Sequence, residues 1–212
     1  PSAPGLAVDS VTVKVFRDRV EAGQQLGRAL VNEGVIAPEG ETDLLVLAIP
    51  RGGVVVGAEV ARALHAPLDV WLSRKLGAPG NPEFGIGSVS SHGETVIDEG
   101  TVAALGVRDE YIQEAIRRER AELGRRMVAY RGSSEPVRVE GRVVVLVDDG
   151  AATGSTALAA LAALDRGGAE KRILALPVAP REVMPALRRA ANATVVLSAE
   201  PFFMAVGQFY QD

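Results

Sequence analysis

The segment from Val143 to Leu164 places the strongest limit on how this chain can fold. Val143–Val147 is a run of apolar, β-forming residues, which is typical of a strand buried on both faces of a parallel sheet. The Ala- and Leu-rich stretch Ala157–Leu164 predicts a helix, and Gly167 and Gly168 are expected to end it. A buried strand joined to a helix by a short turn is part of a βαβ unit, so we expect helices packed on a parallel sheet.

The first third of the chain repeats this order of elements. Leu44–Ile49 predicts a buried strand, a helix follows a glycine turn, and Pro67–Leu72 predicts a second strand. Further helices are expected over residues 16–33, 108–130 and 181–190, and further strands over Ile173–Val178 and Thr194–Leu197. The alternation of strands and helices predicts an α/β fold with a doubly wound, mostly parallel sheet, in a single domain over residues 1–212.

The middle of the chain lacks this regularity. Gly77–Gly100 is rich in Gly, Pro, Asn and Ser and has no strong period, so we predict a flexible loop with at most a short hairpin. The charged helix over residues 108–130 follows. Its arginines are interleaved with acids, which favours a solvated face over a nucleic-acid patch.

Composition excludes several classes of protein. The formal net charge of −4 argues against a protein held on nucleic acid by a basic field. There is no cysteine, and the only histidines are His65 and His92, so we expect neither disulfides nor a multi-histidine metal site. Both histidines are interpreted as structural or surface residues. No apolar run is long enough to span a bilayer and no signal peptide is evident, so a cytoplasmic protein without membrane contact is expected.

The turn after Val147 carries the chemistry. Two adjacent acids, Asp148 and Asp149, leave the tip of the strand, and a run of small residues then enters a helix: Ala151, Ala152, Thr153, Gly154, Ser155 and Thr156. Small residues let backbone amides approach a phosphate at a helix N-terminus, whereas paired carboxylates accept hydrogen bonds from vicinal hydroxyls. Ribose 5-phosphate satisfies both halves. The alternative is that a hydroxyl merely caps the helix and the acids are solvated.

These residues carry a family resemblance. Val143–Thr156 resembles the phosphoribosyl pyrophosphate motif of type I phosphoribosyltransferases. The resemblance implies that the catalytic acids Asp148 and Asp149 bind the ribose hydroxyls and that Ala151–Thr156 cradles the 5′-phosphate. It also implies transfer of the phosphoribosyl group to a nitrogenous base, with release of pyrophosphate. Mg²⁺ would be carried mainly by the pyrophosphate itself, without metal ligands from the protein.

Two further turns resemble parts of this family. Pro50–Gly53 is similar to its pyrophosphate loop, in which Arg51 would bind phosphate oxygens and Gly52 and Gly53 would allow close approach. The resemblance implies a cis bond between Pro50 and Arg51; the alternative is an ordinary strand-to-helix turn. Arg74 and Lys75 resemble a substrate-binding Arg-Lys pair of adenine-type members, and the alternative is a surface basic pair.

The rest of the site is less well defined by the resemblance. Residues 77–100 occupy the place of the family's flexible hood loop, and residues 200–212 resemble a C-terminal hood segment of hypoxanthine-guanine members. Those members carry a third acid where this chain has Ala152. Glu83 is our candidate for a replacement catalytic acid; the alternative is a solvated loop glutamate.

The sequence leaves the acceptor open. A non-catalytic, nucleotide-sensing regulator on the same fold remains the alternative to an enzyme. The oligomeric state is also left open, with a homodimer as one alternative.

Overall fold

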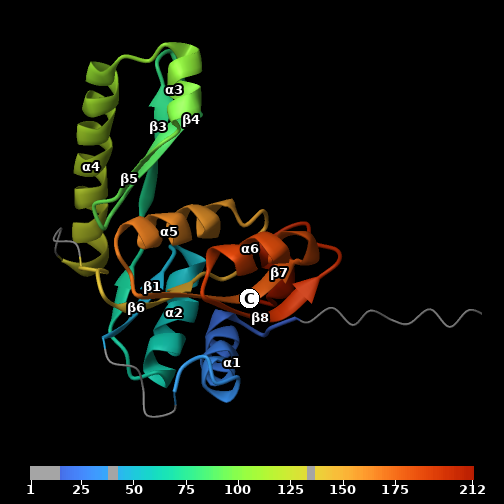
Figure 1. Ribbon diagram of the computed structural model, residues 1–212. Coiled ribbons are helices and arrows are strands. Elements are labelled where there is room, and N and C mark those ends of the chain that lie inside the picture. Colours follow the sequence, from blue (N-terminus) through green and yellow to red (C-terminus); the bar gives the residue numbers. More distant parts are fainter. Residues whose placement is uncertain (1–14, 38–42, 133–136) are drawn as a thin grey trace, which may run out of the picture.

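A five-stranded parallel sheet forms the centre of the molecule. The computed structural model describes residues 15–37, 43–132 and 137–212 (Figure 1). The strand order is β2-β1-β6-β7-β8, and every neighbouring pair is parallel. The strands are β1 (Leu44–Ala48), β2 (Leu68–Val70), β6 (Val143–Val147), β7 (Lys171–Pro180) and β8 (Ala193–Glu200). The predicted α/β fold with a doubly wound, parallel sheet is confirmed.

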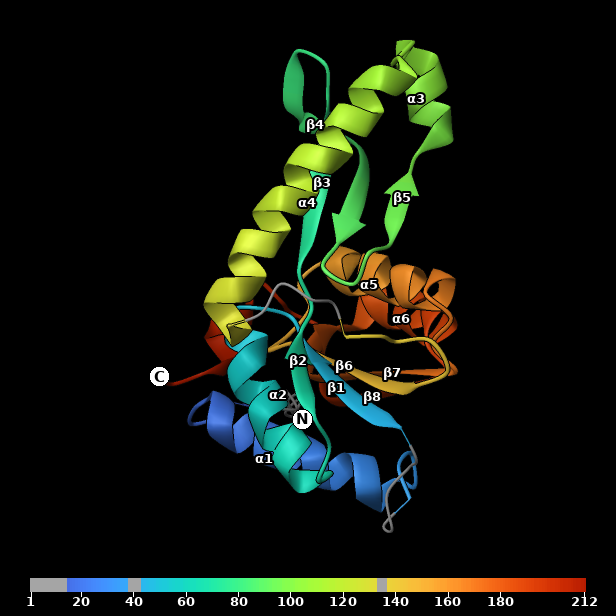
Figure 2. The ribbon, with the colours of Figure 1, turned by 90° about the vertical axis from the view of Figure 1, so that its left-hand side faces the viewer.

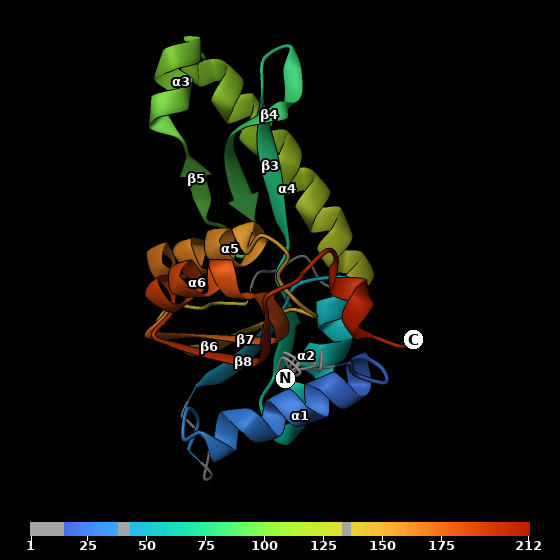
Figure 3. The same ribbon diagram turned by 90° about the vertical axis from the view of Figure 1, so that its right-hand side faces the viewer.

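Helices cover both faces of this sheet. Helices α1 (Arg19–Asn32) and α2 (Gly52–Ala63) lie on one face, and α5 (Ser155–Arg166) and α6 (Met184–Ala190) lie on the other (Figures 1 and 3). A 3₁₀ turn, Arg181–Val183, precedes α6. Alternate residues of each strand point to opposite faces, so a single apolar strand supplies both layers of core.

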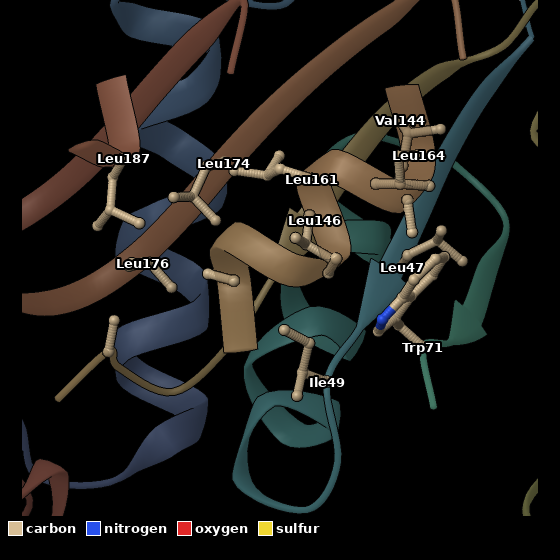
Figure 4. Packing of buried hydrophobic residues seen from close by; sticks show 14 of the residues in the cluster. Leu47, Ile49, Trp71, Val144, Leu146, Leu161, Leu164, Leu174, Leu176 and Leu187 are labelled. Atoms are coloured by element: carbon tan, nitrogen blue, oxygen red, sulfur yellow. The ribbon is translucent and has the colours of Figure 1, made fainter. Parts of the chain in front are cut away.

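The two layers of core follow this alternation. Val46 and Val145 pack toward α1 and α2. Leu47 and Leu146 pack toward Leu161 of α5 and the other helix on that face (Figure 4). All ten residues of β1 and β6 are buried, as the burial patterns of the two strands show. This is why the apolar runs of both strands could be recognised without any alternation of polar residues.

The direction of the chain across the sheet reverses between β1 and β6. The connection after β1 leads outward to β2, whereas the connections after β6 lead the other way to β7 and β8. Ala48 of β1 is in register with Val147 of β6, so the two strands end side by side. Ligands of open parallel sheets bind beyond the carboxyl ends of the strands at such a point. The turns after Ala48 and after Val147 therefore meet at the expected place for a site.

Residues 77–100 differ from the expected loop. They belong to an antiparallel sheet of β3 (Ser73–Ala78), β4 (Asn81–Ser90) and β5 (Thr95–Ile97), which stands away from the main sheet beside α3 (Glu99–Leu105) and α4 (Asp109–Arg131) (Figure 2). We call residues 73–131 the hood. Its own core includes Leu76, Ile86, Ile112 and Ile116.

Glycine composition concealed these strands. A Cβ atom on Gly77 would lie 2.5 Å from the carbonyl oxygen of Pro82, and one on Gly87 would lie 2.3 Å from that of Val96. Glycine is required here because neighbouring backbones approach closely, which is a packing role within strands. The same residues in the sequence suggested a loop.

The base of the hood is fixed to the main sheet by a buried histidine. His92, in the turn between β4 and β5, has a fully buried side chain whose ring stacks on Trp71 with centroids 5.0 Å apart. Its Nδ1 lies 3.1 Å from Ser91 Oγ, and its Nε2 lies 3.5 Å from Asp69 Oδ2. The interpretation of His92 as a structural residue agrees with these contacts.

We expect His92→Ala to lower the free energy of unfolding by about 2 to 3 kcal/mol, because a buried ring and its stacking partner are lost. Urea unfolding followed by circular dichroism measures this loss. His65→Asn is the matched control, because His65 is exposed and asparagine tolerates its positive φ of 50°. Equal stability of His92→Ala and the wild type would show that the turn does not anchor the hood.

The two described ends of the chain pair with each other in a buried cluster that includes Val178 of β7. The Phe16 amide donates to the carbonyl of Phe209 at 2.8 Å, and the Gln211 amide donates to the carbonyl of Phe16 at 3.0 Å. A 3₁₀ turn, Val206–Phe209, precedes this pairing. Residues 209–212, part of the segment expected to belong to the hood, thus lie against Phe16 and Arg17. No helix within the described ranges has the length and apolar character to cross a membrane.

Candidate active site

The paired acids lie at the tip of β6. Asp148 and Asp149 are both half-buried, and the Asp149 amide donates to Asp148 Oδ1 at 2.8 Å. Burial, followed by the neighbouring Asp149 carboxylate, raises the pKa of Asp148 to about 8. At neutral pH the Asp148 carboxyl therefore largely keeps its proton and can both donate and accept a hydrogen bond.

This raised pKa predicts a pH-dependent stability. Between about pH 4 and 8 the folded protein keeps a proton on Asp148 that the unfolded chain releases, so wild-type stability falls as pH rises through this window. Asp148→Asn removes this titration. We compare the free energy of unfolding of Asp148→Asn with that of the wild type at each pH. The variant should gain about 2 to 5 kcal/mol over the wild type between pH 4 and pH 8.

Urea unfolding at several pH values measures the difference. Asp165→Asn is the control, because the Asp165 side chain is 63% exposed. Parallel stability profiles for Asp148→Asn and wild type would mean that Asp148 ionises normally.

The small-residue run after the acids turns the chain into α5. Gly154 has a left-handed backbone with φ of 74°, and α5 begins at Ser155 without a side-chain cap. Thr153 Oγ1 lies 2.9 Å from Ser155 Oγ, and both side chains are exposed. The predicted residues Ala152, Thr153, Ser155 and Thr156 are thus presented to solvent at a helix N-terminus, whereas Ala151 and Gly154 are buried. Backbone amides at this helix N-terminus can donate hydrogen bonds to an anion.

The turn after β1 lies directly against the acids. The Pro50–Arg51 peptide bond is cis, which confirms the expectation for this turn. A Cβ atom on Gly52 would lie 1.9 Å from Asp149 Oδ2, and one on Gly53 would lie 2.8 Å from the Asp148 Cα. Both glycines are therefore required for the two turns to approach, and Arg51 stands at the exposed start of α2.

Two residues that the sequence did not suggest support Asp149. Arg19 Nε lies 2.8 Å from Asp149 Oδ2, and the Tyr210 hydroxyl donates to the Asp149 carbonyl at 2.6 Å. The Arg19 guanidinium also lies 4.5 Å from the centre of the Tyr210 ring. Burial raises the pKa of Tyr210, so its hydroxyl keeps its proton. No motif marks either residue, because each is far from Asp149 in the sequence and reaches it only in the folded chain.

A cavity of about 460 Å³ opens beside the two turns, a size suited to a small ligand. Arg51 and Thr156 contribute one side of it, and Trp71 and Leu72 follow from the end of β2. The last turns of α4 close the other side with Arg126, Ala129 and Tyr130. Helix α4 of the hood thus lines this cavity. The hood residues predicted from the sequence, Arg74, Lys75 and Glu83, line a different one.

Arg74, Lys75 and Glu83 line a second cavity, of about 620 Å³, within the hood. Arg74 Nε binds Glu119 Oε2 at 2.9 Å, and Lys75 Nζ lies 3.1 Å from Glu83 Oε2. The Glu83 side chain is 94% exposed. None of these three residues lines the cavity beside Arg51, and the contacts described for them lie within the hood.

The strand order, the two adjoining turns and the paired acids are those of a phosphoribosyltransferase fold. The sequence matches the phosphoribosyl transferase domain family over residues 31–210. The chain belongs to this family, the type I phosphoribosyltransferases, as the resemblance implied.

Similar proteins support this assignment. Two Mycobacterium tuberculosis proteins, from strains CDC 1551 / Oshkosh and H37Rv, are 37% identical over 200 residues, and both bear the provisional name phosphoribosyl transferase. The match covers 94% of this chain but 44% of theirs, so the chain spans less than half of their length. TT1426 from Thermus thermophilus is 42% identical in sequence to this chain. Its crystal structure matches with a TM-score of 0.74, and the match covers 93% of this chain and 91% of that chain.

Proposed function

We propose that the protein transfers the phosphoribosyl group of phosphoribosyl pyrophosphate to a nitrogenous base and releases pyrophosphate. The observation that carries this proposal is the contact between the two turns at the reversal point of the sheet, where Gly52 and Gly53 lie against Asp148 and Asp149. One ligand that carries a diol, a phosphate and a pyrophosphate can engage both turns at once.

Each part of the substrate has a matching group. The acids of β6 bind the ribose diol, and the exposed start of α5 binds the 5′-phosphate. Arg51 and the turn around it bind the pyrophosphate and stabilise the charge that develops on it as the bond to carbon 1 breaks. The cavity beside Arg51 receives the acceptor, with apolar contacts from Trp71 and Leu72. Enclosure there limits attack by water.

Magnesium enters as part of the substrate in this proposal. Within the ranges 15–37, 43–132 and 137–212, no three His, Cys, Asp or Glu side chains gather in a way that could hold a metal ion. A magnesium ion bound to pyrophosphate oxygens offsets the negative charge of the leaving group.

We propose that the three hood residues contribute less to catalysis than the two turns do. Arg74, Lys75 and Glu83 are engaged with one another or with Glu119 in the second cavity. For Glu83 to act as the acid in catalysis, the hood would have to move toward the acids of β6. We therefore propose that catalysis depends on the diol clamp, Asp148 and Asp149, and on the pyrophosphate turn, Pro50–Gly53. Glu83→Gln should change the rate less than a substitution in either turn.

The test is pyrophosphate release from phosphoribosyl pyrophosphate and Mg²⁺ with a panel of nucleobases and other nitrogen heterocycles, followed by mass detection of the products. Calorimetry with phosphoribosyl pyrophosphate alone runs beside it. Binding together with base-dependent pyrophosphate release supports the enzyme. Binding without release for any acceptor would favour the regulator, and absence of binding would overturn the proposal.

A further inference from the structure

We propose that Arg19 and Tyr210 are positioning residues that hold Asp149 in the orientation in which it accepts the ribose diol. The inference rests on the proposed function, since it concerns the same acid. Arg19 lies before residue 31, outside the range matched by the family model, so nothing in that match assigns it a role.

The two ends of the chain carry these residues to the acid. Phe16 pairs with Phe209 and Gln211 through its backbone, and Phe16, Phe209 and Tyr210 are all buried in one cluster. Asp18 then caps α1 by accepting from the Glu21 amide at 2.7 Å, which fixes where the helix begins. Arg19 is the first residue of α1, so the pairing of the ends and the cap together set its position.

Asp149 is held from two directions. Arg19 binds the side chain at Oδ2, and Tyr210 binds the main-chain carbonyl of the same residue. The Arg19 and Asp149 side chains are 31% and 15% exposed, so water screens this ion pair less than a surface pair. The stacking of Arg19 on the Tyr210 ring links the two contacts into one unit.

This arrangement leaves the acid able to bind hydroxyls. A carboxylate has about four acceptor positions on two oxygens, so Arg19 leaves Oδ1 and part of Oδ2 for the diol. The cation offsets the negative charge of Asp149 beside a substrate that is itself strongly negative. Arg19 should therefore strengthen binding of the ribose part of the substrate. If it instead blocked the acid, its removal would tighten binding.

The experiment compares Arg19→Met with Arg28→Met, an exposed arginine of the same helix. Calorimetry is performed with ribose 5-phosphate, which carries the diol, and with magnesium pyrophosphate, which does not. We expect Arg19→Met to weaken the binding of ribose 5-phosphate about tenfold, because one charge-assisted hydrogen bond on Asp149 is lost. The affinity for magnesium pyrophosphate should not change. Arg28→Met should bind both ligands as the wild type does, and Arg19→Lys should recover part of the loss.

A mutant cycle separates positioning from general damage. In an Asp149→Asn background, Arg19→Met should change ribose 5-phosphate affinity less than in the wild type, since its target is gone. Tyr210→Phe keeps the ring and removes only the hydroxyl, and it should weaken ribose 5-phosphate but not pyrophosphate. Unchanged or tighter ribose 5-phosphate binding in Arg19→Met, or an equal loss for both ligands, would overturn the inference. Wild-type protein that fails to bind ribose 5-phosphate would instead contradict the proposed function.

Discussion

Gly52→Ala is expected to lower the affinity for phosphoribosyl pyrophosphate by about a hundredfold or more. The added Cβ atom would lie 1.9 Å from Asp149 Oδ2 and 2.7 Å from Arg19 Nε, so either the acid or the start of α2 must move. Misplacement of a substrate-binding group by about 1 Å costs on the order of a hundredfold. Because Gly52 belongs to one turn and Asp149 to the other, a single methyl group disturbs both halves of the proposed site.

Calorimetry with phosphoribosyl pyrophosphate and Mg²⁺ measures the effect. Gly100→Ala is the matched control, since the Cβ atom there would only meet Asp98 Oδ1 at 3.5 Å. Thermal unfolding should show that Gly52→Ala still folds, with a loss of about 1 to 3 kcal/mol from overpacking. Wild-type affinity in a folded Gly52→Ala variant would show that the two turns do not act together on the ligand.

The main sheet and its two turns could be predicted because local signals agreed with tertiary burial. Val143–Val147 is the strand that was expected, and the apolar run at Leu44 likewise became β1. A strand buried on both faces needs apolar residues throughout, and a turn at its carboxyl end needs small or polar ones. Both requirements can be read from consecutive residues, so the candidate site residues of the two turns could be proposed from the sequence as well.

The strands of the hood could not be predicted in the same way, although its long helix α4 was. These strands are interrupted by glycines that permit close backbone contact, and glycine in a sequence is equally typical of a loop. Residues 200–212 resemble a C-terminal hood segment, and within them Tyr210 pairs with Phe16, from the opposite end of the described chain. Arg19 and Tyr210 lie far from Asp149 in the sequence and reach it only in the folded chain, so no local pattern could identify them.

Asp149→Asn is expected to lower the binding affinity for phosphoribosyl pyrophosphate by about ten- to a hundredfold. The reason is that each hydrogen bond from a hydroxyl to a charged acceptor contributes about 1.5 to 3 kcal/mol. Stability should change little, because asparagine has nearly the same shape. Magnesium pyrophosphate, which lacks the diol, should bind the variant as it binds the wild type. Calorimetry with both ligands measures this contrast, with Asp165→Asn as the exposed control.

The same variant should also change the ionisation of its neighbour. The Asp149 carboxylate is the second cause, after burial, of the raised pKa of Asp148. With that charge removed, the Asp148 pKa should fall below its value of about 8 while burial keeps it above the usual aspartate range. Carboxyl carbon chemical shifts followed against pH measure this directly. An unchanged Asp148 pKa together with wild-type affinity would show that the two acids do not act as a pair, and the diol clamp would then have to be placed elsewhere.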